Sequence, residues 1–153
     1  MFERIDRIAI AVRNLEKAER FFSDLLDIEF DPPGQTEGLG MRGSYSKCGL
    51  ELITSTHPDS VIGRFLKQRG EGVWAVVLKV KNMDEAVKEF EQKGLRVAGD
   101  IQFKGMREVA FHPKDSYGVE IVLAEYPEMH PATVAGILGV TAPAGGRGGE
   151  GTS

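Results

Sequence analysis

The chain has 153 residues, of which 41% are hydrophobic and 27% are charged, and its formal net charge is −4. This composition is typical of one water-soluble globular domain, and no apolar run reaches the roughly 18 residues that a membrane-spanning helix requires. Lysine and arginine form no cluster, which argues against a nucleic acid or an anionic membrane as a partner. The N-terminal residues show no secretory signal, and Cys48 has no second cysteine with which to form a disulfide, so we expect a cytoplasmic protein.

An internal repeat organises the chain. Residues 8–18 reappear in similar form as residues 76–86. Each copy begins with a β-rich run, continues with an asparagine suited to cap a helix (Asn14 or Asn82) and then takes up a helical pattern. The repeat therefore predicts two related units, each with a strand followed by a helix.

Both predicted helices are amphipathic, because their apolar residues recur at helical spacing. These residues are Leu15, Ala18, Phe22, Leu25 and Leu26 in the first helix and Met83, Ala86, Val87 and Phe90 in the second. Each helix is expected to cover a sheet with this apolar side.

Short β-rich segments follow each helix and complete a β-α-β-β-β order in both halves. They lie at residues 28–30, 40–46 and 50–54 in the first half and at residues 95–97, 107–112 and 119–125 in the second. Neither half is large enough to bury both faces of its sheet alone, so the two halves should pack together.

The predicted domain spans residues 4–125. The first module covers about residues 4–56, a linking helix about 59–70 and the second module about 72–125. Residues 126–153 form a C-terminal extension whose last dozen residues are Gly-rich and are expected to be disordered.

This repeated unit resembles the vicinal-oxygen-chelate superfamily, which includes glyoxalase I, extradiol dioxygenases and bleomycin-resistance proteins. Within the superfamily, the chain resembles the methylmalonyl-CoA epimerases most. The residues that carry the resemblance are 4–18, 50–53, 59–72 and 111–119, and the stretch Phe-Leu-Lys-Gln-Arg-Gly-Glu-Gly at 65–72 is the most specific. The resemblance implies an α+β fold in which two βαβββ modules form a cupped mixed sheet.

The resemblance also implies four metal-ligand positions in the cup, which carry His, Glu or Gln, His and Glu in family members. In this chain the corresponding residues are Arg7, Glu51, Ala75 and Val122. Only Glu51 offers an oxygen ligand, whereas a divalent ion of this kind takes about six oxygen or nitrogen ligands. We therefore expect no metal and no other cofactor.

Strand alternation predicts which side chains take the place of the ion. It directs Arg7, Glu51, Lys79 and Glu120 into the cup, two cations and two carboxylates. Arg7 beside Glu51 could replace the ion and receive an acyl or carboxylate oxygen. Alternatively, the four groups only neutralise one another and close the cavity. The sequence leaves both interpretations open.

Other candidates are weaker. Glu37 lies near the position where epimerases carry a base, but an exposed loop carboxylate is the alternative. Trp74 could line the cavity together with Ala75 and Val122, but the pattern favours a core aromatic. Arg64 on the linking helix could contact CoA phosphates, and a solvated basic helix face is the alternative.

The resemblance implies an acyl-CoA-like or other small carbonyl ligand and proton transfer beside its carbonyl group. In this hypothesis Arg7 stabilises an oxyanion without a metal, and Glu51, Glu120 or Glu37 is the base, as in an isomerase or a lyase. The alternative is a non-catalytic protein that sequesters a small molecule, as bleomycin-resistance proteins do. Whether the protein is an enzyme stays open, and a homodimer is expected from the habit of the superfamily.

Overall fold

The computed structural model describes residues 2–36, 39–103 and 105–127 as a single curled sheet with three α-helices. Its eight strands follow the order β2-β3-β4-β1-β5-β8-β7-β6. The elements are β1 (Phe2–Ala11), α1 (Leu15–Leu26), β2 (Gly34–Thr36), β3 (Met41–Tyr45), β4 (Leu50–Ser55), α2 (Val61–Arg69), β5 (Gly72–Val80), α3 (Met83–Gln92), β6 (Val97–Phe103), β7 (Met106–Phe111), a 3₁₀ helix (Pro113–Asp115) and β8 (Glu120–Glu125). The predicted α+β class with a cupped mixed sheet is confirmed.

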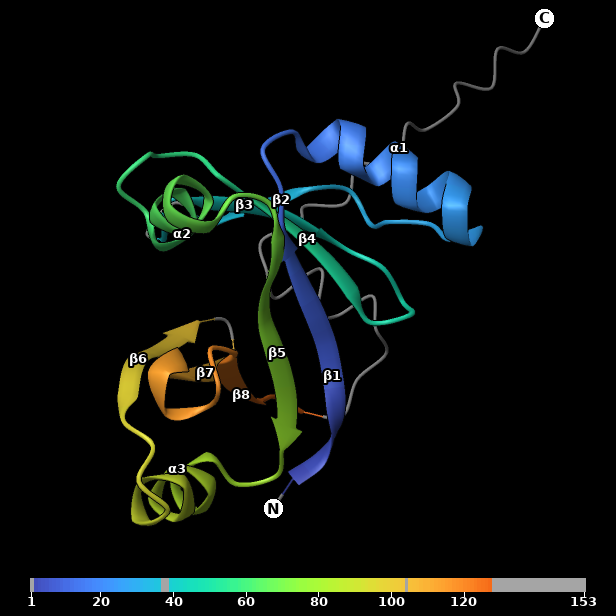
Figure 1. Ribbon diagram of the computed structural model, residues 1–153. Helices are drawn as coiled ribbons and strands as arrows, with labels where there is room; N and C mark the ends of the chain where they lie inside the picture. Colours follow the sequence, from blue (N-terminus) through green and yellow to red (C-terminus); the bar gives the residue numbers. More distant parts are fainter. Residues whose placement is uncertain (1, 37–38, 104, 128–153) are drawn as a thin grey trace, which may run out of the picture.

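The repeat is visible in the strand pairing. β1 pairs in parallel with β4, and β5 pairs in parallel with β8, so each half closes in the same way. The two halves meet where β1 and β5 pair antiparallel. Figure 1 shows β2, β3 and β4 facing β6, β7 and β8 across the cup, with β1 and β5 as the wall that joins them.

The predicted helix starts are also confirmed. Asn14 accepts a hydrogen bond from the Lys17 amide at 2.9 Å, and Asn82 accepts one from the Glu85 amide at 3.1 Å. Ser60 caps α2, the predicted linking helix, in the same manner. Each cap satisfies an amide that the first helical turn leaves unpaired.

The first strand after α1 is not where the pattern placed it. In the predicted strand at residues 28–30, Phe30 makes only an isolated bridge with Ser46, and β2 begins at Gly34. Prolines at positions 32 and 33 explain the difference, because they have no amide hydrogen to donate to a neighbouring strand.

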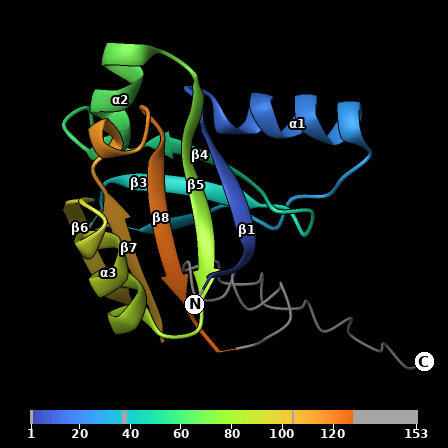
Figure 2. The same cartoon turned by 60° about the horizontal axis from the view of Figure 1, so that its bottom comes forward.

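The core divides between the two faces of the sheet. The concave face is lined by Ala9, Ala75, Val77, Met106, Val122, Ala124 and Tyr126. On the convex face, α3 covers β5, β7 and β8, whereas α1 contacts the sheet through Leu15, Ala18 and Phe22. The prediction that Leu25 and Leu26 are also buried is wrong, because the C-terminal part of α1 extends away from β1 (Figure 2).

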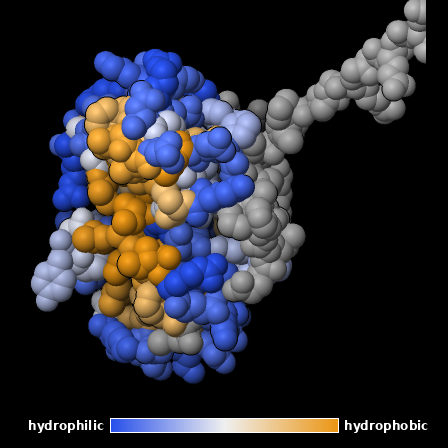
Figure 3. All heavy atoms as spheres, turned by 90° about the vertical axis from the view of Figure 1, so that its right-hand side faces the viewer, coloured by the Kyte–Doolittle hydropathy of each residue, from blue (hydrophilic) through white to orange (hydrophobic). Residues whose placement is uncertain are grey.

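An apolar surface results from this divergence. Figure 3 shows apolar side chains gathered on the side of the molecule that carries α1 and β1. The exposed large apolar residues of these elements, named here the apolar face, are Phe2, Ile5, Ile8, Phe21, Leu25 and Leu26. None of the helices in the described ranges is both long and apolar enough to cross a membrane.

Candidate functional site

An irregularity in β1 brings two charged neighbours into the cup. Between Ile5 and Arg7 the pairing with β5 shifts by one residue, and Asp6 is the extra residue. Such a β-bulge interrupts the alternation of side chains between the two faces of a sheet. As a result Asp6 and Arg7 are both buried, and both contact residues of the concave face.

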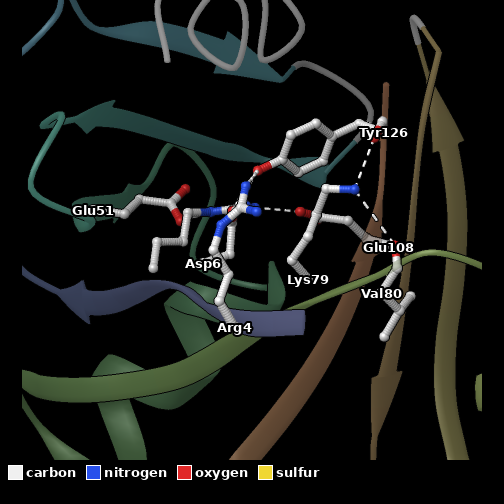
Figure 4. Close-up of polar contacts among 8 residues, drawn as sticks. Arg4, Asp6, Glu51, Lys79, Val80, Glu108 and Tyr126 are labelled. Atoms are coloured by element: carbon white, nitrogen blue, oxygen red, sulfur yellow. Dashed lines mark hydrogen bonds and ion pairs between the residues drawn. The ribbon is translucent and has the colours of Figure 1, made fainter. Parts of the chain in front are cut away.

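Arg7 is surrounded by carboxylates from three strands. Its Nε donates to Glu51 Oε2 at 2.7 Å, its Nη1 donates to Asp6 Oδ2 at 2.8 Å, and its Nη2 donates to Glu108 Oε1. Figure 4 labels the three carboxylate residues, and we call these residues together with Arg7 the Arg7 centre. Burial disfavours the charged form of Arg7, but the three carboxylates outweigh that effect and raise its pKa.

Tyr126 and Lys79 form a second layer behind the Arg7 centre. The Tyr126 hydroxyl donates to Asp6 Oδ1, and burial together with this bond raises the pKa of Tyr126. Lys79 Nζ donates to the Tyr126 carbonyl at 2.8 Å and lies 4.3 Å from the centre of its ring. The predicted cavity residue Lys79 is therefore buried, and it fixes the residue that follows β8.

Glu120 lies apart from the Arg7 centre. It starts β8 opposite Ala75 and, by strand alternation, shares the concave face with Val122. Its carboxylate forms no hydrogen bond or ion pair with any residue in the described part of the chain, and burial raises its pKa. The four charged side chains that alternation predicted in the cup therefore do not form one cluster: only Arg7 and Glu51 touch.

The remaining predicted site residues occupy different places. Ala75 and Val122 lie buried on the floor of the cup, and Trp74 packs against that floor and against the cluster under α2. Arg64 is exposed on α2 and donates to the carbonyl of Asp59. Glu37 lies outside the described residues.

The sequence interpretation missed Asp6, Glu108 and Tyr126. A usable signal existed for Glu108, because it pairs with Ala124 across β7 and β8 and so faces the same side as that inward residue. No comparable signal existed for Asp6, since simple alternation would have turned it to the convex face.

The Arg7 centre does not fit a divalent cation. Of the four positions that the resemblance assigns to metal ligands, Arg7 offers only donor hydrogens, and Ala75 and Val122 offer no ligand atom. The fourth, Glu51, already accepts a hydrogen bond from Arg7. Within the described ranges, no group of three or more His, Cys, Asp or Glu residues is arranged to hold a metal ion.

Comparisons with known proteins agree with this fold. The profile of the Glyoxalase/Bleomycin resistance protein/Dioxygenase superfamily matches residues 6–111. Mitochondrial methylmalonyl-CoA epimerase of Bos taurus is 30% identical over 129 residues, which cover 80% of this chain and 74% of that protein. A Streptomyces coelicolor methylmalonyl-CoA epimerase variant, solved in complex with 2-nitronate-propionyl-CoA, matches with a TM-score of 0.76 at 27% identity over 83% of this chain and 99% of its own. The resemblance is thereby confirmed, and the chain belongs to the Glyoxalase/Bleomycin resistance protein/Dioxygenase superfamily.

Proposed function

We propose that the protein transfers a proton at the carbon beside the carbonyl group of an acyl-CoA-like thioester, without a divalent metal. Similarity to methylmalonyl-CoA epimerases, one of them solved with a CoA derivative bound, supports this substrate class. The observation that carries the proposal is the Arg7 centre, a buried cation at one of the positions where the superfamily resemblance implies a metal ligand.

A positive charge near the carbonyl group of the ligand favours removal of the proton from the neighbouring carbon. Removing a proton beside a carbonyl group leaves negative charge on the carbonyl oxygen, and a fixed positive potential in a water-poor site stabilises that charge. Arg7 is the buried cation at this place, and the carboxylates that contact it weaken the positive potential that it supplies. Because a guanidinium is a weaker electrophile than a metal ion, the reaction depends more on the other groups in the cup.

Glu120 is the carboxylate best suited to act as the base. It faces the cup, it is half-buried, and it has no counter-ion among the described residues. Burial raises its pKa and so brings its proton affinity closer to that of a carbon acid's conjugate base. Glu51, the other described candidate, is held by Arg7, while the role of Glu37 stays a prediction.

Deuterium exchange tests the proposal directly. Malonyl-type CoA thioesters are incubated with the protein in D₂O, and the α-proton signal is followed by NMR. We expect the wild-type protein to exchange the α-proton faster than the protein-free solution does. Glu120→Gln should lower this exchange rate by about 10²-fold or more. Glu89→Gln is the control and should leave the rate unchanged, because Glu89 pairs with Lys93 on an exposed helix surface. Absence of exchange with every malonyl-type thioester would contradict the proposal, as would a stoichiometric EDTA-removable ion in protein purified without a chelator.

A non-catalytic binding function is the second candidate. The observation that favours it is that Arg7 is only 2% exposed and that each of its three nitrogens already donates to a carboxylate. Such a centre could serve only to close the bottom of a binding cup. Native mass spectrometry of the purified protein separates the two functions: a copurifying CoA thioester supports the first, and an aromatic or glycopeptide-like compound supports the second.

We also propose that the chain forms a homodimer through the apolar face. The two halves are repeats, yet the apolar side of α3 is covered by β7 and β8, while Phe21 and Leu25 of α1 lie exposed. The apolar face has two parts, one on α1 and one on β1. A two-fold axis would place the α1 part of one copy on the β1 part of the other, so the surface is complementary to itself.

A further inference from the structure

The Arg7 centre holds more negative than positive charge. Asp6, Glu51 and Glu108 share one guanidinium, and their side chains are 3%, 10% and 14% exposed. Two further cations lie nearby: Arg4, whose side chain is 47% exposed, is 3.7 Å from Asp6 Oδ1, and Lys79 is 3.7 Å from Glu3. With these residues included, the carboxylates of Asp6, Glu51, Glu108 and Glu3 still outnumber the cations Arg7, Arg4 and Lys79. Carboxylates that share a buried site do not all ionise, because each charge raises the cost of the next.

The contacts distinguish which carboxyl group keeps a proton. Asp6 accepts hydrogen bonds on both of its oxygens, from Arg7 and from the Tyr126 hydroxyl. Glu108 accepts one bond, on Oε1, and its Oε2 makes no hydrogen bond to any described residue. Burial raises the pKa of Glu108, and the neighbouring charges of Glu51 and Asp6 act in the same direction against the attraction of Arg7.

Glu108 also faces the cup. Its neighbours in the same inward row of β7, Met106 and Ala110, both pack into the concave cluster. Arg7, by contrast, is 2% exposed, and each of its three nitrogens donates to a carboxylate.

We propose that Glu108 is a neutral carboxylic acid at neutral pH and that its Oε2–H donates a hydrogen bond to the carbonyl oxygen of the ligand. This assignment rests on the proposed function and makes Glu108, rather than Arg7, the group that touches the developing oxyanion. A neutral carboxylic acid in a site that excludes water is an effective donor for such an oxygen. Arg7, Glu51 and Asp6 then act as positioning residues that hold Glu108 in place.

The protonation state is tested on the wild-type protein without any ligand. Glutamate labelled with ¹³C at Cδ is incorporated, the Glu108 signal is assigned by its absence in Glu108→Gln, and its shift is followed between about pH 5 and pH 9. We expect Glu108 to be protonated at neutral pH, in the presence of Arg7, Asp6, Glu51 and the nearby Tyr45 hydroxyl. A Glu108 signal that shows an ionised carboxylate at neutral pH would overturn the assignment.

Stability measurements give a second readout. Because the folded-state pKa of Glu108 is raised, its contribution is most favourable at low pH and is lost as pH rises through that value. Glu108→Gln should therefore match the wild type near pH 5 and become the more stable protein at higher pH, whereas Glu51→Gln should lose stability at neutral pH. Equal losses in Glu108→Gln and Glu51→Gln at neutral pH would mean that Glu108 is an ordinary ionised partner of Arg7.

The exchange assay then tests the donor role. Glu108→Ala should slow exchange of the α-proton by about 10²-fold, the usual effect of losing one oxyanion donor, and Glu108→Gln should retain part of the rate. The control is Asp100→Asn. The Asp100 carboxylate contacts Arg107, whose side chain lies on the face of β7 opposite to that of Glu108. Wild-type exchange with an unaffected Glu108→Ala would overturn the donor role. Absence of exchange in the wild type would instead contradict the proposed function, and the NMR titration would still decide the protonation state.

Discussion

At the scale of single residues, Arg7 is the side chain on which the centre of the cup depends. Replacing Arg7 by Ala leaves Asp6, Glu51 and Glu108 buried without their cation. We expect Arg7→Ala to lower the free energy of unfolding by about 3–5 kcal/mol at neutral pH. Urea denaturation measures this loss, which should shrink at acidic pH because protonated carboxyl groups need no counter-ion.

The matched control for this prediction is Arg96→Ala. The Arg96 side chain makes two hydrogen bonds to the carboxylate of Asp115, but it is 64% exposed. Exposed ion pairs contribute about 0–1 kcal/mol, so the control should change stability little. An Arg7→Ala protein as stable as the wild type would show that the carboxylates are hydrated and that the cup is open at its floor.

The sequence allowed part of this centre to be predicted. Alternation along two strands was enough to place Arg7 beside Glu51, because Arg7 keeps the inward direction of Ala9 and Ala11 and Glu51 pairs with Ala9. Alternation failed for Asp6, because a β-bulge depends on how β1 pairs with β5 and not on the sequence pattern of β1 alone. Glu120 was predicted on the correct face but joined to the wrong partners, because alternation gives the face of a side chain and not its distance along the cup.

At the scale of elements, the repeat supplies a matched pair of helix caps. Asn14 and Asn82 occupy equivalent positions and make equivalent bonds to α1 and α3. We expect Asn14→Ala and Asn82→Ala each to cost about 1 kcal/mol of stability, because each leaves a first-turn amide without its acceptor. Urea unfolding tests this, with Asn14→Ser and Asn82→Ser as controls that keep an acceptor. Alanine and serine variants of equal stability would contradict the capping role.

Element positions were predictable where a local signal marks them. Asparagine caps and apolar periodicity located α1 and α3, and the duplication located their strands. Periodicity alone assigned Leu25 and Leu26 to the buried side of α1, but it cannot show where a straight helix leaves a curled sheet. Apolar periodicity also does not locate β2, because the start of this strand follows from the two prolines after residue 31 and not from an apolar run.

At the scale of the whole molecule, the curled sheet separates two surfaces with different consequences. The concave face gathers charge from both modules, because β1, β4 and β7 each contribute a carboxylate or the guanidinium to one point. On the convex face, apolar residues stay exposed because α1 does not cover them. Both features follow from joining two repeats edge to edge, which creates one shared concave face and leaves the outer junction incompletely covered.

The apolar face therefore makes a prediction about assembly. If a second copy covers it, sedimentation equilibrium should give twice the 16.7 kDa mass of the chain, and a charge placed in the contact should dissociate the pair. Leu25 and Ile5 are 62% and 58% exposed, so Leu25→Glu and Ile5→Glu should fold normally as monomers, because neither side chain is needed in the core. Val97→Glu is the control, since it adds the same charge at an exposed apolar residue on β6, at the far end of the strand order. A wild-type monomer at every concentration, or dissociation by Val97→Glu alone, would remove the apolar face as the contact.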